Sequence, residues 1–232
     1  MPSKPFSHQS RTQAYIPLAI FATLISWDLS GLDLPLAQLT GGPDGFPWQH
    51  HWLFSTVLHR GMKYLAWALV LAVGISAIRP WGPFTVLPKA RRLQLALMPL
   101  ILAGVIALLK GTNNTSCPWD LTQFGGVASY ASHWSSWISG DGGGGHCFPA
   151  GHASSGFAFI GSYFALKQDV PRLARRWLFA AVVAGLLLGI MQQLRGAHFL
   201  SHTLWTGWFC WLIGWASNPL FTRHVRGANA SG

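Results

Sequence analysis

The chain has 232 residues, of which 50% are hydrophobic and 9% are charged. Soluble domains carry about a quarter charged residues, so this composition excludes an ordinary soluble domain. The net charge of +10 at pH 7 would suit a nucleic-acid-binding protein, but the positions of the cations along the chain argue against that class.

Six apolar runs of about 17 to 20 residues are separated by polar connections. At 1.5 Å per residue, helices of this length extend about 26 to 30 Å, enough to cross the hydrocarbon core of a bilayer. The runs cover residues 15–33, 62–78, 93–109, 150–166, 177–194 and 199–216. The sequence therefore predicts an all-α protein, with residues 1–232 forming one integral-membrane domain, a six-helix transmembrane bundle.

The first run follows Lys4 and Arg11 and thus begins like a cleaved signal peptide. No small-x-small cleavage site follows, and removal of the run would leave an odd number of spans, so we expect it to be retained. Asp28 lies at its outer end, where a charge is costly, and is expected to pair with a cation in a structural role.

The Lys and Arg residues predict the orientation of the bundle. With both termini inside, the inner side holds Lys4, Arg11, Arg79, Lys89, Arg91, Arg92, Lys167, Arg172, Arg175, Arg176, Arg223 and Arg226. The outer side holds only Arg60, Lys63, Lys110 and Arg195. This bias follows the positive-inside rule and predicts cytoplasmic termini. It also explains the basic charge without nucleic acid.

The longest connection, residues 110–149, joins the third and fourth runs on the outer side. A loop of about 40 residues in a compact bundle is usually functional. Cys117 and Cys147 lie near its ends, and a disulfide that closes about 30 residues adds about 3 kcal/mol of stability in oxidising conditions. We predict a Cys117–Cys147 disulfide, with two free thiols as the alternative. Cys210, in mid-span, is expected to be an inert core residue.

Polar residues gather at the outer ends of three runs. Lys110 ends the third run, and Pro149-Ala150-Gly151-His152 opens the fourth. N–H groups at a helix start bind phosphate, and a glycine lets the backbone approach closely, so Gly151 is a candidate phosphate-binding residue. His152 is suited to protonate a leaving oxygen.

The third cluster is Arg195-Gly-Ala-His198-Phe-Leu-Ser-His202. His198 and His202 are four residues apart and share one face of a helix, which suits a histidine nucleophile and a partner that orients it. Arg195 is suited to clamp phosphate oxygens. The His198/His202 pair also has the spacing of zinc ligands, so a metal-dependent hydrolase is one alternative.

These clusters resemble the three signature motifs of the type 2 phosphatidic acid phosphatase superfamily, which read KxxxxxxRP, PSGH and SRxxxxxHxxxD in chain order. They appear here as Lys110-x6-Cys117-Pro118, Pro149-Ala150-Gly151-His152, and Gln192 through His198 to His202. The resemblance implies a six-span membrane enzyme that removes phosphate from lipids without a metal ion or other cofactor.

Position by position, the resemblance implies that Lys110 binds phosphate and that His152 is the general acid. It implies that His198 is the nucleophile, forming a phosphohistidine, and that His202 takes the orienting role of the family's aspartate. The departures from the motifs are Cys117 for Arg, Ala150 for Ser, Gln192 for Arg and His202 for Asp. We infer that Arg195 substitutes for the arginine missing at position 192, and that Asp120 and Asp141 are candidates to supply the missing carboxylate.

The sequence thus predicts a multi-pass lipid phosphatase of the bacterial inner membrane, with a periplasmic active site and a phosphorylated membrane lipid as its partner. Phosphatidate, phosphatidylglycerol phosphate, polyprenyl pyrophosphate and lipid A phosphate all fit, and nothing in the chain chooses among them or separates hydrolysis from phosphotransfer. The substituted motifs leave open a catalytically inactive lipid-binding protein. The histidines expected at the surface or membrane interface are His50, His51, His59 and His133.

Overall fold

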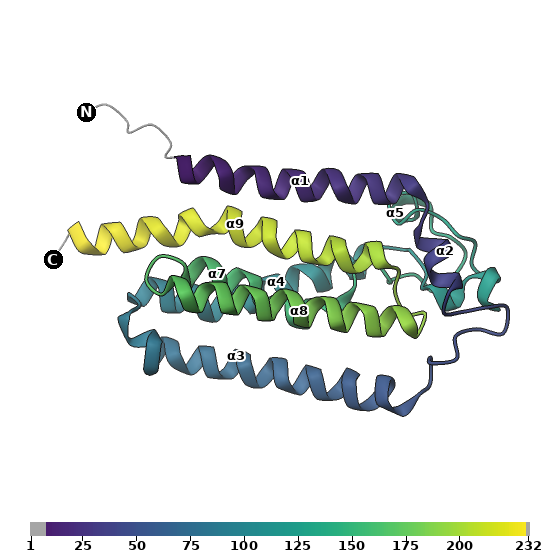
Figure 1. Ribbon diagram of the computed structural model, residues 1–232, viewed down its shortest axis with the longest axis horizontal. Coiled ribbons are helices and arrows are strands. Elements are labelled where there is room, and N and C mark those ends of the chain that lie inside the picture. The colour runs from purple at the N-terminus through teal and green to yellow at the C-terminus, as the bar shows by residue number, and fades with distance from the viewer. Residues whose placement is uncertain (1–7, 231–232) are drawn as a thin grey trace.

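The computed structural model describes residues 8–230, except for the side chains of residues 8–14, 16, 58–60 and 223–230. Within that part of the chain every regular element is a helix, as the sequence predicts. The long helices are α1 (His8–Ser30), α3 (Met62–Ile78), α4 (Lys89–Thr112), α8 (Pro171–Leu194) and α9 (Leu200–Ala230). They lie side by side in one bundle (Figure 1).

The helices of the described chain outnumber the six that the sequence predicts. The additional short elements are α2 (Asp33–Gln38), η1 (Leu53–Gly61), η2 (Gly82–Val86), η3 (Pro118–Asp120), η4 (Thr122–Phe124) and α5 (Ser136–Ser139). The predicted run 150–166 is divided into α6 (Gly151–Phe157) and α7 (Ile160–Leu166). The division arises because the Phe159 N–H bonds to the Gly156 carbonyl three residues back, at 3.1 Å, which tightens the helix.

Two helix ends also differ from the predicted boundaries. The first run, predicted to reach residue 33, ends at Ser30 because Gly31 adopts a left-handed conformation with φ of +66°. Helix α4 continues past the predicted end of its run to Thr112, so Lys110 lies in its last turn rather than at the start of the loop.

Three helical stretches of the described chain are long and apolar enough to cross a membrane: Leu53–Ile78, Lys89–Thr112 and Pro171–Leu194. They identify a membrane protein. Helix α9 is long but less apolar, since Ser201, His202, Thr203 and Thr206 are buried on it. Its polar residues face the interior of the bundle rather than lipid.

Small residues allow the helices around the site to approach closely. A Cβ added at Gly156 of α6 would collide with the backbone of Gly185 in α8, and a Cβ at Gly189 of α8 would collide with Thr203 of α9. Such close backbone packing is typical of helices in membranes. Cys210 is fully buried in the core that α4, α6, α7 and α9 share, as expected.

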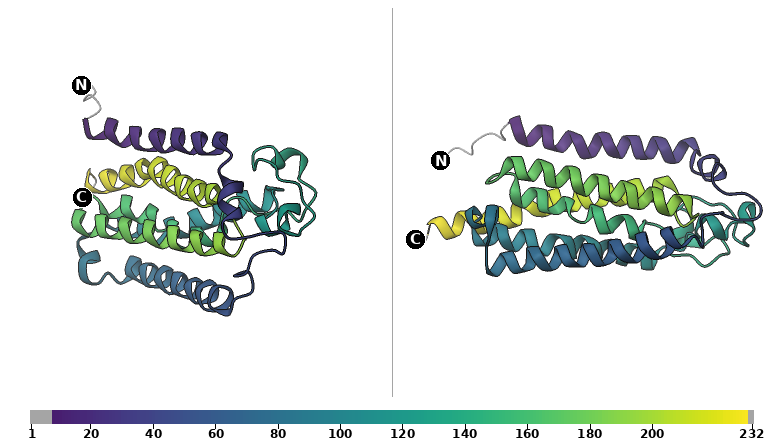
Figure 2. Two further views of the ribbon diagram at one scale, coloured as in Figure 1. Left: turned by 45° about the vertical axis from the view of Figure 1, so that its right-hand side comes forward. Right: turned by 60° about the horizontal axis from the view of Figure 1, so that its bottom comes forward.

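The two ends of the bundle differ. The start of α1 and the end of α9 lie at one end, whereas α2, α5 and the long loop before α6 lie at the other (Figures 1 and 2). The end of α4 and the starts of α6 and α9 also lie at this loop end. The segments that carry the three polar clusters therefore meet at one end of the molecule.

Candidate active site

Three of the predicted site histidines lie in a row at the loop end. The ring centroid of His198 is 6.0 Å from that of His152 and 5.9 Å from that of His202. His152 is the second residue of α6, His198 precedes α9, and His202 lies in the first turn of α9. His198 and His202 are 2% and 1% exposed. The ring of His198 therefore stands between two other imidazoles and away from solvent.

A backbone carbonyl orients the ring of His198. Its Nδ1 atom lies 2.8 Å from the carbonyl oxygen of Cys147. Because a carbonyl oxygen only accepts hydrogen bonds, Nδ1 carries the proton and Nε2 keeps its lone pair. The sequence assigned the orienting role to His202, but the Nδ1–H of His198 donates to the Cys147 carbonyl, and the His202 and His198 rings meet edge-on.

The carbonyl of Cys147 is itself held in place by the loop. Cys147 forms a disulfide with Cys117. Its N–H donates to the Thr115 carbonyl at 2.9 Å, and the neighbouring His146 N–H donates to Asn113, also at 2.9 Å. These contacts join the two ends of the long loop beside His198.

The surroundings of His198 keep its ring neutral. Burial lowers the pKa of His198 well below its ordinary value of 6.5, and the positive charges of Lys110 and His152 lower it further. The hydrogen bond to Cys147 opposes these effects and is the smaller contribution. His198 therefore presents a neutral, nucleophilic Nε2 at neutral pH.

Lys110 and Gly151 lie together next to this ring. A Cβ added at Gly151 would lie 3.4 Å from Cδ of Lys110, so the lysine stem passes over the first residue of α6. The absence of a side chain at Gly151 leaves room for this approach. The structure thus brings Lys110, Gly151 and His152 together near His198.

Arg195 lies at the border of the site. Its Nε donates to the Gln49 carbonyl at 3.0 Å, and its Nη1 donates to Gln192 Oε1 at 3.1 Å. Its guanidinium also lies 5.9 Å from the ring centre of Trp119 in the loop. Gln192, at the position where the motif has arginine, is therefore hydrogen-bonded to the arginine one turn later.

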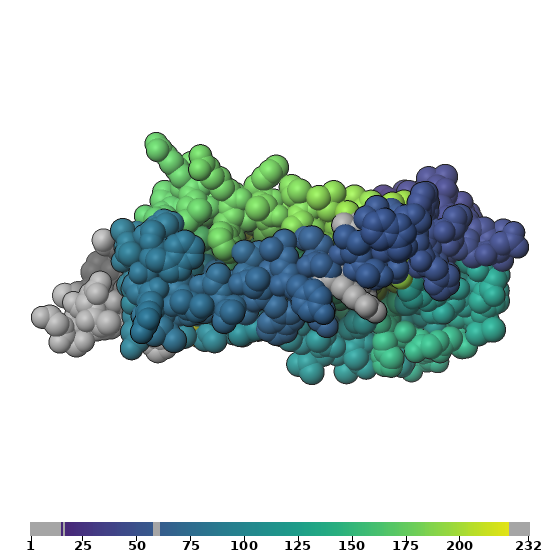
Figure 3. All heavy atoms as spheres, turned by 90° about the horizontal axis from the view of Figure 1, so that it is seen from below, coloured from purple at the N-terminus to yellow at the C-terminus, as the bar shows by residue number. Residues whose placement is uncertain are grey.

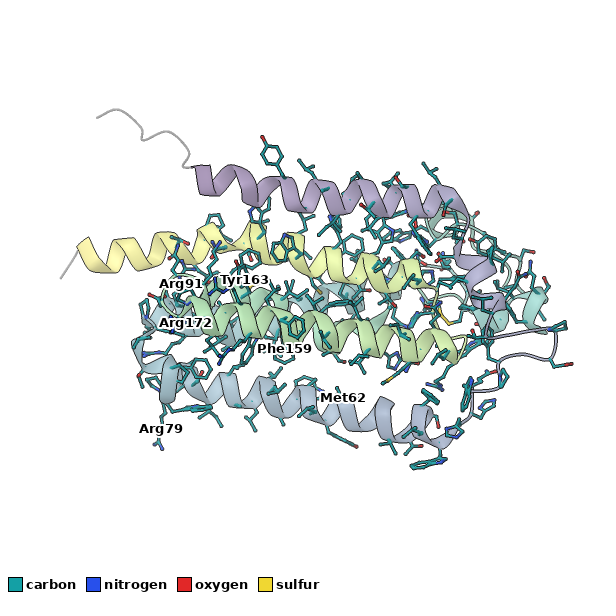
Figure 4. The ribbon with its side chains drawn as sticks, in the orientation of Figure 1. Met62, Arg79, Arg91, Phe159, Tyr163 and Arg172 are labelled. Carbon is teal, nitrogen blue, oxygen red and sulfur yellow. A yellow bond between two sulfur atoms is a disulfide. The ribbon has the colours of Figure 1, made fainter. Side chains whose placement is uncertain are left out.

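Two cavities open between α3 and the helices that carry the site. One has a volume of about 290 Å³ and is lined by apolar side chains of α3 and α4 and by a set of mostly polar residues: Lys63, Gly151, His152, Ser154, Ser155 and Gln192. The other, of about 260 Å³, is lined almost entirely by apolar side chains of α3, α6 and α8. Met62 and Phe159 line both cavities (Figure 4), and α3 forms the outer wall of the bundle on this side (Figure 3).

Two further titratable residues reach the row of histidines. His133 is 5% exposed, stacks on Phe148 at 4.1 Å between ring centroids and meets the His202 ring edge-on at 5.5 Å. The expectation that His133 lies at the surface is wrong. A carboxylate oxygen of Asp28 lies 3.4 Å from Nε2 of His133. The charge of Asp28 inside an apolar run was the only signal of this contact in the sequence, and His133 lies in a loop without periodicity.

The two loop carboxylates have other partners. Asp120 accepts the Cys117 N–H at 3.2 Å. Asp141 accepts the N–H of Ser116 at 2.7 Å and its hydroxyl at 2.6 Å. Burial, the largest influence, raises the pKa of Asp120. Both side chains therefore serve to fold the loop, and neither supplies the carboxylate that the sequence led us to expect there.

Within the described residues, no three His, Cys, Asp or Glu side chains converge in a way that would hold a metal ion. The pair His198 and His202 is accompanied by His133 and aromatic rings, not by a further ligand at metal-binding distance. The arrangement is that of a neutral imidazole between two other rings, with a lysine nearby.

The comparison with known families agrees with this arrangement. Residues 92–226 match the PAP2 superfamily, and neither a curated protein nor a solved structure matches the chain significantly. The matched segment is more than half of the chain and contains Lys110, His152, His198 and His202. The chain belongs to the PAP2 superfamily.

Proposed function

We propose that the protein is a membrane lipid phosphatase that works through a phosphohistidine at His198. PAP2 proteins are in general phosphatases and related phosphoesterases of lipid-like substrates. The observation that carries the proposal is the state of His198, a buried neutral imidazole whose Nδ1 is fixed by the Cys147 carbonyl. Its Nε2 is left for attack, with His152 and Lys110 nearby.

The proposed reaction has two steps. In the first, Nε2 of His198 forms a bond to phosphorus, and the bond between phosphorus and the lipid oxygen breaks. The departing oxygen keeps the electron pair and takes a proton from His152. In the second, water attacks phosphorus and gives its proton to His152, while the N–P bond breaks and the electron pair returns to Nε2. Lys110 stabilises the negative charge on the phosphoryl oxygens in both steps.

The cavities support a lipid as the substrate. The cavity of about 290 Å³ has polar lining from His152, Gln192, Ser154, Ser155 and Lys63, and the rest of its lining along α3 and α4 is apolar. A phosphorylated headgroup fits the polar end, and the chains of the same lipid fit the apolar part and the second cavity. We propose that the substrate enters from the bilayer, beside α3. Phosphatidate, phosphatidylglycerol phosphate, polyprenyl pyrophosphate and lipid A phosphate share this chemistry.

We also propose that the chain crosses the bacterial inner membrane six times, with α1, α6–α7 and α9 as spans besides the three long apolar stretches. The start of α1 and the end of α9 lie at the same end of the bundle, which suits an even number of crossings (Figure 1). The cation bias places that end in the cytoplasm and the loop end in the periplasm.

Substitution of the two rings tests the proposal. In His198→Ala the nucleophile is lost, and in His152→Ala the acid is lost, so we expect phosphate release to fall by at least about 1,000-fold and 100-fold, respectively. The measurement is release of inorganic phosphate by purified protein from the four lipids named above, with and without chelator. His50→Ala, which changes an exposed histidine before η1, is the matched control and is expected to keep full activity.

The outcomes separate the alternatives. Rapid quenching with a ³²P-labelled lipid should trap an acid-labile phosphoprotein in the wild type and none in His198→Ala. Turnover by His198→Ala above a tenth of the wild-type rate would refute the assigned nucleophile. Loss of activity with chelator and its return with zinc would indicate a metal-dependent hydrolase. Transfer of label to an acceptor lipid would indicate a phosphotransferase, and no turnover on any lipid a binding protein.

A further inference from the structure

A half-buried carboxylate near the end of α1, that of Asp28, is held by three aromatic side chains. Oδ2 of Asp28 accepts the indole N–H of Trp205 at 2.9 Å and that of Trp134 at 3.0 Å, and it lies 3.4 Å from Nε2 of His133. The side chains of Asp28 and His133 are 11% and 6% exposed. Two donors thus fix this carboxylate against an imidazole, and neither indole carries a charge that neutralises it.

The imidazole that Asp28 faces, that of His133, is the first of two rings that lead to His198. His133 stacks flat on Phe148 and meets the His202 ring edge-on, at 5.5 Å between centroids. His202 in turn meets His198 at 5.9 Å. Phe148 and Phe199 pack against His202 at 5.3 and 5.4 Å. Aromatic walls therefore hold the rings in one order from Asp28 to His198.

This arrangement places a negative charge within reach of the positive charge that forms on His198 during phosphoryl transfer. When His198 bonds to phosphorus through Nε2 and keeps its Nδ1 proton, its ring becomes a cation inside a buried site. The carbonyl of Cys147 is a dipole and carries no net charge, and Lys110 adds a positive charge beside the ring. A negative charge at the far end of the row favours that cation, because buried charges interact strongly through a medium of low dielectric constant.

We infer that Asp28 is a positioning residue for His198, which acts through His133 and His202 to hold the row of rings and to favour the cation formed during phosphoryl transfer. The inference rests on the proposed function. Asp28 lies outside residues 92–226, the segment that matches the PAP2 superfamily. The chain thus supplies from its first helix a carboxylate that position 202, a histidine here, does not provide.

Asp28→Asn is the direct test, since asparagine keeps an oxygen that accepts from Trp134 and Trp205 but removes the charge. We expect kcat to fall about tenfold with KM unchanged, because the charge acts on the cation and not on lipid binding. Asp28→Glu should restore part of the lost kcat. The inference would be overturned if kcat of Asp28→Asn equalled that of the wild type, or if KM rose by the same factor as kcat fell.

Asp33→Asn is the matched control. Asp33, the first residue of α2, is buried, and its Oδ1 accepts the Trp27 indole N–H at 2.9 Å and the Ser201 N–H at 3.1 Å. Asp33→Asn removes a buried carboxylate that binds an indole but, among the described residues, forms no ion pair with His133, His202 or His198. We expect Asp33→Asn to keep the wild-type kcat. If kcat fell equally in Asp28→Asn and Asp33→Asn, the role of Asp28 would be structural only.

A double-mutant cycle tests the route through His133. His133→Phe keeps a ring to stack on Phe148 but removes both ring nitrogens. If Asp28 acts through His133, the variant with both changes should lose no more kcat than the more impaired single variant. If the fold loss of kcat in the double variant equals the product of the two single losses, Asp28 acts by a route that does not include His133.

A spectroscopic measurement separates this inference from the proposed function, because it needs no substrate. The measurement is NMR of the protein labelled with ¹⁵N-histidine in detergent micelles. We expect Asp28→Asn to shift the ring resonances of both His133 and His202, and Asp33→Asn to leave them unchanged. Unmoved resonances would refute the coupling even in an active phosphatase. Moved resonances in a protein that fails to release phosphate from any lipid would refute the function alone.

Discussion

The molecule has a second buried polar region, at the end opposite the histidine row. Arg91 of α4 is 1% exposed, and its guanidinium donates to Gln94 at 2.7 Å, Asn218 at 2.8 Å, Gln168 at 2.9 Å and Thr222 at 3.0 Å. Arg91 lies at the end of the bundle away from the loop (Figure 4). We call these five residues the Arg91 cluster.

The two regions satisfy their polar groups in different ways. Each partner of Arg91 is a neutral oxygen with a short hydrogen bond, and the partners come from α4, the connection before α8, and α9. The histidine row, which runs from His133 through His202 and His198 to His152, consists of titratable rings between aromatic walls, with a backbone carbonyl at His198 and a cavity beside His152. A buried group saturated by neutral partners ties helices together, whereas a buried titratable group next to a cavity is available for chemistry.

The largest effect that would sharpen this contrast is expected at Arg91. Arg91→Met keeps the length of the side chain but leaves buried amide and hydroxyl oxygens without their donor, so we expect a loss of about 2 to 4 kcal/mol of folding free energy. The activity per folded molecule should stay at the wild-type level. Thermal unfolding in detergent and phosphate release on the same samples measure both quantities.

Arg92→Met is the control for this change, since Arg92 is the next residue of the same helix and is only half-buried. It should lose less stability than Arg91→Met. If Arg91→Met lowered kcat but not stability, the Arg91 cluster would not be a purely structural region, and the contrast with the histidine row would be wrong.

Loss of the disulfide is expected to have a similar effect on stability and, unlike Arg91→Met, to lower the catalytic rate as well. Replacing Cys117 and Cys147 together by alanine removes a cross-link over 30 residues, with an expected cost of about 3 kcal/mol. We also expect kcat to fall, because the Cys147 carbonyl that orients His198 is no longer anchored at its side chain. Reducing agent should lower the unfolding temperature of the wild type and leave the double variant unchanged. A double variant with wild-type kcat would show that the backbone of the loop alone fixes this carbonyl.

The sequence could predict the features that follow from a repeating pattern of residues or from a short local motif. Apolar runs of membrane-spanning length predict helices, and the structure confirms that the chain is helical. The polar residues at the ends of three runs meet at one end of the bundle because successive helices alternate in direction. His152, His198 and His202 therefore become neighbours, although His152 and His198 are far apart in the sequence.

The elements that sequence could not predict depend on contacts between distant segments. His133 has the same chemistry as the exposed His50, and only the stack on Phe148 and the approach of α1 bury it. The carbonyl that orients His198 belongs to the backbone and leaves no trace in residue type. The break between α6 and α7 follows from a local change in hydrogen bonding that the residue types of the run do not indicate.

The smallest expected effect is a displacement of the pH profile, which separates the histidine row from the Arg91 cluster without unfolding either. Because burial lowers the pKa of His198 below 6.5, its ring stays neutral as the pH falls through 6.5, and the acid limb of kcat/KM assigned to His198 should lie below that value. Lys110 contributes to this lowering, so Lys110→Met should raise the pKa of His198 and move the acid limb to higher pH, in addition to weakening phosphate binding. Arg91→Met should leave the limb where it is. A limb that stays in place in Lys110→Met would show that the lysine charge does not reach the nucleophile.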